Sequence, residues 1–208
     1  MTSIADSSLR SLDYTLFHAV NGLAGRSAAL DAVMIGSAKY LPIVFALALV
    51  ALWLSWRPRN QRGAFLAGAS ALIALGLGQL IGKGFPRPRP YMTHVVNQLI
   101  PRSLDTSFPS DHAIIGFAVA VMVWRYNRLA GVVLLLLATL MAIARVFVGA
   151  HFPGDVLGGA VLGTLTSVAL AMLSERGAIA RMLDMFFRLL RHWRAAAPET
   201  GPGATPLR

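Results

Sequence analysis

Five apolar runs constrain this chain more than any other feature of its sequence. They cover 41–56, 64–82, 111–125, 129–148 and 156–174. A helix needs about 20 apolar residues to cross about 30 Å of hydrocarbon, and somewhat shorter runs also serve. With 56% hydrophobic and 13% charged residues, the 208-residue chain is also too apolar for an ordinary soluble domain. The sequence therefore predicts an all-α fold, a polytopic transmembrane bundle of five spans.

The first 40 residues contain only short apolar pieces, around Tyr14–Leu23 and Leu30–Ala38. We interpret them as interfacial helices, with a sixth span as the alternative. Residues 1–194 are then a single integral-membrane domain. The segment 195–208 is rich in Pro, Gly, Ala and Thr, and this composition predicts a disordered tail.

Basic residues gather on one side of the predicted spans. They are Arg57, Arg59, Arg62, Arg125, Arg128 and the arginines from 176 onward. The positive-inside rule makes that side cytoplasmic, with the N-terminus outside and the C-terminus inside. Residues 176–194 have apolar side chains at helical spacing opposite arginines, which predicts a basic amphipathic helix on the anionic inner leaflet. A solvated face on a packed helix is the alternative.

The net charge of +10 does not indicate nucleic-acid binding. The arginines are distributed by membrane side and are not interleaved with exposed aromatic residues. Loops 83–110 and 149–155 each follow an outward-going span. We therefore expect both loops on the external face, where their polar residues can meet.

The first loop opens with three cations among alternating prolines: Lys83, Arg87 and Arg89. Proline at every second position excludes a regular helix and holds the backbone extended. The planar fork of arginine suits phosphate oxygens, and lysine adds a point charge. Anchoring of the span to lipid headgroups is the alternative reading of these cations.

The same loop ends at Ser110, Asp111 and His112, directly before an apolar run. Ser110 is placed to cap that helix, which leaves the amides of its first turn free for an anion. His112 lies at the same helix start. An interfacial histidine that only closes a cap is the alternative.

The second loop supplies Arg145, His151 and Asp155. An unpaired arginine near the end of a span needs a partner or a polar cavity. A carboxylate four residues from an imidazole can hold its Nδ1–H and leave Nε2 as a nucleophile or base. Two histidines, a carboxylate and several cations favour phosphoryl transfer. A metal site fits less well, because the arginines repel a metal cation.

These residues resemble a known family. Arg-Pro at 89, Pro-Ser-x-His at 109–112 and Arg-x5-His-x3-Asp at 145–155 are similar to the three-part signature of the type 2 phosphatidic acid phosphatase superfamily. The resemblance covers about residues 30–174, and the three ordered motifs together are highly specific. Within the superfamily the chain most resembles bacterial undecaprenyl-diphosphate phosphatases.

The resemblance implies a role for each motif residue. His151 would be the nucleophile that forms a phosphohistidine, Asp155 would orient it, and His112 would be the general acid. The phosphoryl oxygens would be held by Arg89, Arg145, Ser110 and the backbone amide of Asp111. The family mechanism implies no metal and no cofactor.

Three positions depart from the family pattern. Lys83 is six residues before Arg89 instead of seven, and Gly82 occupies the family's lysine position, so Arg87 is an alternative phosphate ligand. Asp111 stands where most members have glycine, and we expect it to pair with Lys83 or Arg87. Ala144 replaces the serine that often precedes the motif arginine.

The sequence thus predicts a multi-pass enzyme of the bacterial inner membrane with a periplasmic active site. It would remove the terminal phosphate from undecaprenyl diphosphate and leave undecaprenyl phosphate. Phosphatidylglycerol phosphate, phosphatidate or the phosphate of lipid A are alternative substrates. A non-catalytic lipid-phosphate binding protein or flippase is the alternative from another class.

Overall fold

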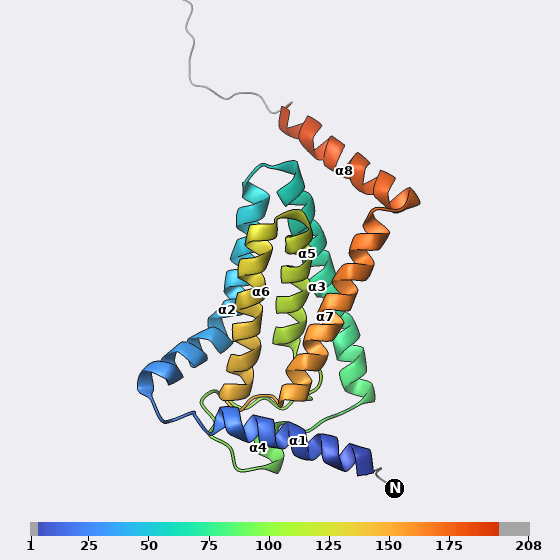
Figure 1. Cartoon of the computed structure of the whole chain (residues 1–208). Coiled ribbons are helices and arrows are strands. Elements are labelled where there is room, and N and C mark those ends of the chain that lie inside the picture. The colour runs from blue at the N-terminus through green and yellow to red at the C-terminus, as the bar shows by residue number, and fades with distance from the viewer. Residues whose placement is uncertain (1–3, 196–208) are drawn as a thin grey trace, which may run out of the picture. The chain divides into compact units, whose positions relative to one another are not determined.

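The structure is a computed structural model that describes residues 4–195, with side chains described at 8–177 and 179–189. Over these residues it is all-helical, as predicted. The helices are α1 (Ile4–Asn21), α2 (Ala28–Leu54), α3 (Pro58–Gly84), α4 (Pro90–Thr93), α5 (Asp111–Tyr126), α6 (Arg128–Phe147), α7 (Pro153–Ser174) and α8 (Gly177–Ala195) (Figure 1). The chain divides into two compact units between Ala171 and Met172, which are described separately.

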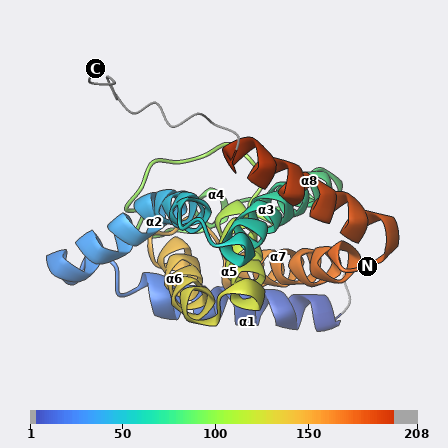
Figure 2. The same cartoon turned by 90° about the horizontal axis from the view of Figure 1, so that it is seen from above.

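α5 is the central helix of the first unit. It packs most extensively against α3 and α6, and one row of its small and apolar residues is fully buried. Figure 2 shows it among α2, α3, α6 and α7. A 16-residue helix is about 24 Å long at 1.5 Å per residue, which is short for a span. Because the other helices surround α5, they present most of the surface that faces lipid.

Small residues allow α7 to approach α5 closely. A Cβ atom at Gly159 would lie 2.6 Å from the carbonyl oxygen of Ser110, and one at Gly163 would lie 2.4 Å from that of Ile114. This is the small-xxx-small spacing that brings helix backbones together in membranes. The hydroxyl of Ser167 donates to the carbonyl of Ala118, which adds a buried hydrogen bond between the same two helices.

Four of the described helices are long and apolar enough to cross a membrane. They are α2, α3, α6 and α7. The prediction of a multi-pass helical membrane protein is confirmed by these helices. α5 coincides with the predicted span 111–125 but is too short to be included among the four.

The predicted boundary between a helix over Leu30–Ala38 and the span from residue 41 is absent. These residues belong to α2, which runs without interruption from Ala28 to Leu54 and contains Pro42. Figure 1 shows that the first part of α2 is inclined to the rest. Proline inside a helix removes one backbone hydrogen bond and causes a kink, so a change of direction occurs without a break in the helix.

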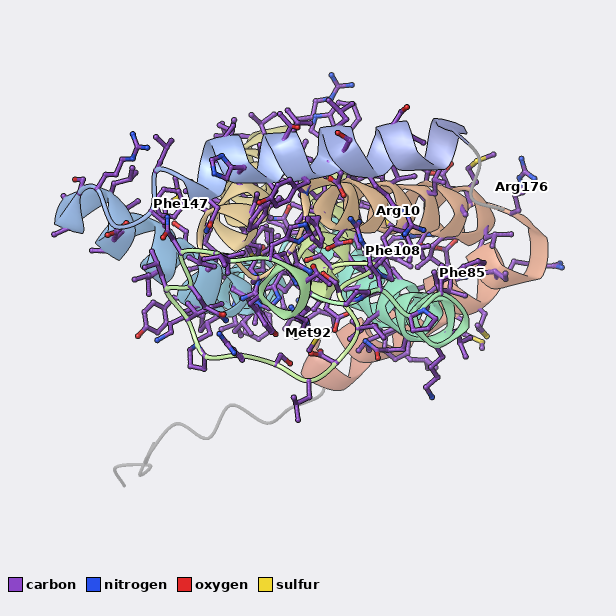
Figure 3. The ribbon with its side chains drawn as sticks, turned by 90° about the horizontal axis from the view of Figure 1, so that it is seen from below. Arg10, Phe85, Met92, Phe108, Phe147 and Arg176 are labelled. Carbon is purple, nitrogen blue, oxygen red and sulfur yellow. The ribbon has the colours of Figure 1, made fainter. Side chains whose placement is uncertain are left out.

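α1 lies across the ends of α6 and α7 (Figures 1 and 3). Phe17 is 1% exposed, and its ring lies 5.4 Å from that of Phe152 in a tilted arrangement. Asn21 is also buried, and its amide nitrogen donates to the carbonyl oxygens of Asn97 and Phe147 at 2.8 Å. α1 is therefore fixed to the bundle by an apolar contact and by buried amide hydrogen bonds.

The two loops of the predicted site meet at this same end of the unit, as expected from the order of the spans. The backbone amide of Leu99 donates to the carbonyl of Val148, and that of Ser110 donates to the carbonyl of Asp155. Gly149 has φ +81°, and a Cβ there would lie 3.1 Å from the carbonyl oxygen of Asn97. A glycine at this position allows the chain to turn tightly after α6.

The second unit contains α8, which spans the predicted basic amphipathic helix at 176–194. Within the described side chains, Leu183 and Phe187 are buried, while Arg181 and Arg188 are exposed. The end of the predicted apolar face, from residue 190, lies outside the described side chains. The predicted tail lies outside the described residues apart from Ala195.

Candidate active site

A polar cavity of about 160 Å³ lies where the two loops meet. Its lining comes from α3, the loop before α5, the start of α5, the end of α6 and the loop before α7. The lining residues are Gly78, Gln79, Arg89, Ser103, Asp105, Thr106, Phe108, Pro109, Asp111, His112, Arg145 and His151. Both motif histidines and both motif arginines of the sequence analysis therefore face one small cavity.

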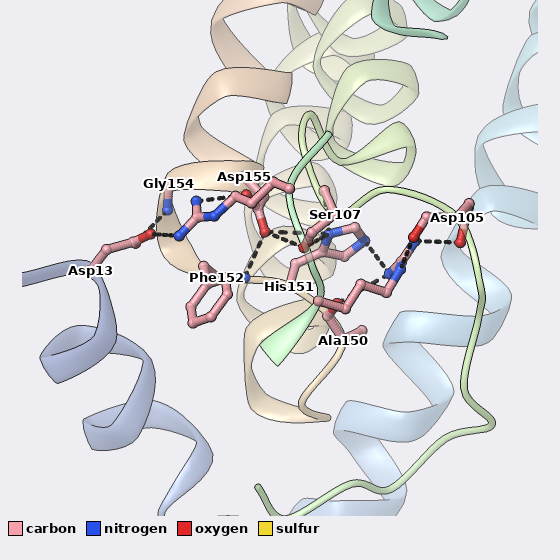
Figure 4. A network of polar contacts seen from close by, with 10 residues as sticks. Asp13, Asp105, Ser107, Ala150, His151, Phe152, Gly154 and Asp155 are labelled. Carbon is pink, nitrogen blue, oxygen red and sulfur yellow. Dashed lines mark hydrogen bonds and ion pairs between the residues drawn. The ribbon is translucent and has the colours of Figure 1, made fainter. Parts of the chain in front are cut away.

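The imidazole of His151 is held in one tautomer. Nδ1 lies 2.9 Å from the carbonyl oxygen of Ser107, which only accepts, so Nδ1 carries the proton. Nε2 lies 3.2 Å from Nη1 of Arg89, which only donates, so Nε2 presents its lone pair. Arg145 helps to place the ring, because its carbonyl accepts from the backbone amide of His151. The unprotonated Nε2 thus points at the guanidinium of Arg89, which also lines the cavity (Figure 4).

Asp155 is fully buried and is held by several donors. Oδ2 accepts from the hydroxyl of Ser107 and from the backbone amide of Phe152, and Oδ1 accepts from Arg87 at 2.8 Å. Oδ2 lies 3.8 Å from Nδ1 of His151, which is longer than a hydrogen bond. Asp155 therefore acts on His151 as a nearby charge, and the carbonyl of Ser107 orients the ring.

Arg89 connects His151 to the loop before α5. Its guanidinium donates to the carbonyl of Ala150 at 3.1 Å and pairs with the carboxylate of Asp105 at 3.0 Å. The side chain of Arg89 is almost fully buried, while that of Asp105 is 59% exposed. Ser103 donates a further hydrogen bond to Asp105. An anion that enters the cavity would compete with this exposed carboxylate for Arg89.

Two buried polar atoms at the site have no hydrogen-bond partner among the described residues. They are Nε of Arg145 and Oγ of Ser110. Buried polar groups are normally paired, so each such atom indicates a ligand or water. The predicted side-chain cap by Ser110 is wrong: Ser110 is the N-cap residue of α5, but its hydroxyl makes no capping bond.

Asp111 pairs with a residue that the sequence analysis did not consider. Both of its carboxylate oxygens accept from Nε2 of Gln79, each at 3.0 Å. The predicted pairing with Lys83 or Arg87 is therefore wrong. Gln79 lies one turn before Lys83 on α3 and faces the cavity, whereas Lys83 is exposed and is not part of the lining.

The structure also places the other cations of the first loop. Arg87 lies outside the cavity lining, where it bridges Asp155 and Asp13 and stacks 4.3 Å from the ring of Phe152. Position 82 has no room for the family's lysine, because a Cβ there would lie 2.8 Å from Oγ1 of Thr106. Among the predicted cations, Arg89 and Arg145 line the cavity.

Four residues of this network had no assigned role in the sequence analysis. They are Asp13, Gln79, Asp105 and Ser107. Ser107 lies inside the motif run before Ser110, so its proximity to the signature was the available signal. Asp13, Gln79 and Asp105 carry no local signal for these pairings, since Asp13 and Arg87 are 74 residues apart, Gln79 and Asp111 are 32 apart, and Asp105 and Arg89 are 16 apart.

Two ionisable side chains in the loops, those of His151 and Asp105, have shifted pKa values. Burial lowers the pKa of His151 below its ordinary value, the charges of Arg145 and Arg89 add to this, and the Asp155 carboxylate opposes it. Burial alone would raise the pKa of Asp105, but the hydrogen bond from Ser103 and the charge of Arg89 hold it below its usual range. His151 is therefore neutral and Asp105 ionised near neutral pH.

A larger, mostly apolar groove of about 1040 Å³ adjoins the site. It is bordered by α1 and by the residues that follow α3 and precede α7. Its apolar lining includes Leu9, Leu12, Leu16, Phe85, Phe108, Phe152 and Leu157 (Figure 3). Phe108 lines both this groove and the polar cavity. The two spaces together suit a ligand with an anionic head and an apolar chain.

Comparisons with known proteins agree with this arrangement. The model of the PAP2 superfamily matches residues 63–177. Undecaprenyl-diphosphatase BcrC of Bacillus subtilis is 33% identical over 154 residues, which are 74% of this chain and 80% of the relative. The bacitracin transport permease protein BcrC of Bacillus licheniformis is 32% identical over 162 residues, 77% of this chain and 80% of the relative.

A solved structure shares the fold. The crystal structure of Aquifex aeolicus LpxE superposes with a TM-score of 0.67 at 28% sequence identity. The match covers 77% of this chain and 95% of that chain. The similarity thus includes most of the bundle as well as the motif loops.

Proposed function

Because this chain belongs to the PAP2 superfamily, we propose that it is a membrane lipid phosphatase that removes the terminal phosphate of undecaprenyl diphosphate. The relative from Bacillus subtilis, named as an undecaprenyl-diphosphatase, supports this substrate. The apolar groove beside the cavity supports a substrate with a long hydrocarbon chain. We propose that the polyprenyl chain lies in this groove and the diphosphate in the polar cavity.

The proposed first step is attack by Nε2 of His151 on the terminal phosphorus. The Nε2–P bond forms as the bond from phosphorus to the bridging oxygen breaks. His112 donates a proton to that oxygen, so undecaprenyl phosphate leaves and a phosphohistidine remains. Arg89 moves from Nε2 to a phosphoryl oxygen, and Arg145 and Ser110 bind the others, which stabilises the charge that develops there.

Water completes the proposed cycle. It attacks the phosphohistidine, His112 takes a proton from it, and the P–Nε2 bond breaks to release inorganic phosphate. Asp155 stabilises the imidazolium that forms on His151 in both steps. The proposed residues are His151, His112, Asp155, Arg89, Arg145, Ser110 and the backbone amide of Asp111, with no metal or cofactor.

We propose five spans, α2, α3, α5, α6 and α7, with α1 at the external interface. α5 is buried among the other four helices, so a 16-residue span suffices there. Arg57, Arg59, Arg125 and Arg128 lie at the end opposite the cavity, and by the positive-inside rule this supports a cytoplasmic location of that end. The active site then faces the periplasm of a bacterial inner membrane, and the C-terminus is cytoplasmic.

The observation that carries this proposal is the set of buried, unpaired polar atoms near an imidazole whose Nε2 is unprotonated. Arg145 and His151 line the same cavity, and Ser110 lies between two of its lining residues, Pro109 and Asp111, so Nε of Arg145 and Oγ of Ser110 can donate to an anion there. A binding protein needs the donors but not the nucleophile. The presence of both favours catalysis over binding alone.

The test measures phosphate release by the purified protein in detergent, with and without EDTA. The substrates are undecaprenyl diphosphate, phosphatidylglycerol phosphate, phosphatidate and lipid A. We expect release from undecaprenyl diphosphate that the chelator does not change. Faster release from another lipid would identify that lipid as the substrate instead.

Two variants assign the nucleophile. His151→Ala should lower kcat by about 10⁴-fold or more, as expected for the removal of a nucleophile. His18→Ala, on the exposed face of α1, is the matched control and should keep full activity. Trapping of labelled phosphate on the parent chain, and not on His151→Ala, would support the phosphohistidine. No release from any of the four lipids would favour a binding protein or flippase.

A further inference from the structure

The carboxylate of Asp13 is joined to Asp155 through the guanidinium of Arg87. Nη2 of Arg87 lies 2.5 Å from Oδ2 of Asp13, and Nη1 lies 2.8 Å from Oδ1 of Asp155. The other oxygen of Asp13 accepts from the backbone amide of Gly154 at 2.7 Å (Figure 4). One side chain of α1 thus contacts both the start of α7 and the arginine that binds the buried carboxylate.

We propose that Asp13 is a positioning residue for phosphoryl transfer, which acts through Arg87 on Asp155 and so on the imidazole of His151. This inference rests on the proposed function, because it concerns the same nucleophile. The superfamily model matches from residue 63 onward, so α1 lies outside the segment that defines the family. Asp13 is a part of the site that the three motifs do not include.

Arg87 needs a second carboxylate to have a single orientation. A guanidinium carries its donors in a rigid plane, so two partners at opposite ends of that plane fix its rotation. Asp155 and Asp13 hold the two ends, and the ring of Phe152 lies 4.3 Å from the guanidinium carbon. Without Asp13, Nη2 of Arg87 would bind water, and the guanidinium plane of Arg87 would be free to rotate on its long side chain.

Arg87 is the donor to Oδ1 of Asp155, whereas Ser107 and the backbone amide of Phe152 hold Oδ2, so Arg87 sets the rotation of the carboxylate about those two bonds. Oδ2 of Asp155 is 3.8 Å from Nδ1 of His151, while Oδ1 receives its hydrogen bond from Arg87. When His151 attacks phosphorus, its ring becomes positively charged, and the carboxylate stabilises that charge more strongly at a shorter distance. A small displacement of Asp155 therefore raises the barrier to the chemical step more than it weakens substrate binding.

Attachment of α1 to the bundle does not require the charge of Asp13. Phe17 is buried against Phe152, and Asn21 exchanges hydrogen bonds with Asn97. The hydrogen bonds of Asn21 do not involve Arg87, although the ring of Phe152 also stacks on its guanidinium. A purely structural role for Asp13 would therefore appear in the melting temperature, whereas a positioning role appears in kcat.

The test is a double-mutant cycle on the full-length protein in detergent, with undecaprenyl diphosphate as substrate. Asp13→Asn should lower kcat about tenfold while KM stays within about twofold, a coupling of ordinary size for contacting charged residues. Arg87→Gln should lower kcat by at least as much. In the Arg87→Gln background, Asp13→Asn should change kcat by less than about twofold, because the connection is already absent.

Two control variants separate charge from packing. Asp13→Glu keeps the charge and should restore kcat to within about threefold of the parent. Phe17→Leu removes only apolar contact from α1, so it should lower Tm and leave kcat within about twofold. If Asp13→Asn does not fold, Asp13→Ser replaces it in the same cycle.

The outcomes that overturn the inference are distinct from those that overturn the proposed function. An unchanged kcat in Asp13→Asn, or losses that multiply in the double variant, would show that Asp13 does not act through Arg87. The parent chain would still release phosphate in that case, so the proposed function would stand. A parent chain that releases no phosphate from any lipid would overturn both.

Discussion

The two sides of the polar cavity differ in how fully their polar atoms are paired. On the His151 side, each ring nitrogen and each oxygen of Asp155 has a protein partner. The other side consists of Nε of Arg145 and of Oγ of Ser110, which lies between the lining residues Pro109 and Asp111, and neither of these buried atoms has a hydrogen-bond partner among the described residues. The first side is fully paired within the protein, whereas the second has two buried polar atoms that a ligand can pair.

This difference shows how the site separates positioning from binding. A buried network with all its bonds made keeps the nucleophile in one tautomer and one orientation before substrate arrives. Buried donors without partners have already lost their hydration, so a phosphoryl group gains the full strength of the hydrogen bonds it accepts. Substitutions on the two sides should therefore have different kinetic effects.

Among substitutions that keep His151, the largest effect is expected on the unpaired side. Arg145→Lys keeps a positive charge but loses the planar fork, so it cannot donate two parallel hydrogen bonds to a phosphoryl group. We expect kcat/KM to fall about 100-fold or more, the size seen when one donor to a developing charge is removed. Steady-state kinetics in detergent measure this effect. Arg128→Lys, at the opposite end of α6, is the matched control and should retain full activity.

A smaller effect is expected on the paired side. Ser107→Ala removes the hydroxyl that donates to Asp155 but keeps the carbonyl that accepts from His151. The ring thus keeps its tautomer, while the carboxylate loses one of its donors. We expect kcat to fall about tenfold, as for the loss of one hydrogen bond to a charged group, with KM little changed. An equal rise in KM would contradict the separation of the two sides.

The sequence predicted much of this site because the motif residues lie at helix ends. His112 lies in the first turn of α5, Arg145 in the last turn of α6, and Asp155 in the first turn of α7. Apolar runs define where such helices end, and the order of the spans defines which ends meet. The local sequence was therefore sufficient to predict that the two motif loops lie at one end of the bundle.

The contacts that the sequence did not predict are made between distant segments. Asp13 reaches Arg87 across 74 positions of the chain, and Gln79 reaches Asp111 across 32. Such pairs depend on how α1 crosses the bundle and on which face of α3 points inward. The continuity of α2 was also missed, because Pro42 and the polar residues before it resemble a helix boundary, while the helix accommodates them with a kink.

A third prediction concerns the carboxylate on the lining of the cavity. The oxygens of Asp111 face Gln79 and lie beside the space proposed for an anionic phosphoryl group. Asp111→Asn removes a negative charge that repels this group, so we expect KM for undecaprenyl diphosphate to fall about threefold, with kcat little changed. Inhibition by inorganic phosphate should strengthen by a similar factor. Asp31→Asn, at the start of α2 and away from the cavity, is the control.

An unchanged KM in Asp111→Asn would mean that the carboxylate does not act on the bound anion. A higher KM would mean that its hydrogen bonds to Gln79 matter more than its charge. In that case Gln79→Ala should raise KM by the same factor. The pair of variants thus separates repulsion of the substrate from support of the cavity wall.

The smallest expected effect is a displacement of the pH profile, and it tests the paired side. Attack requires neutral His151, and the pKa of this buried imidazole is lowered, chiefly by burial. The ring therefore stays neutral as the pH falls through its ordinary value of about 6.5, and protonation removes activity only below that point. We expect the acidic limb of kcat/KM to lie below pH 6.5.

Titration of the substrate's own phosphate, followed by ³¹P NMR in the same micelles, is the control. An acidic limb above pH 6.5 that the substrate does not account for would mean that the buried network stabilises the charged ring, contrary to the pairing described here.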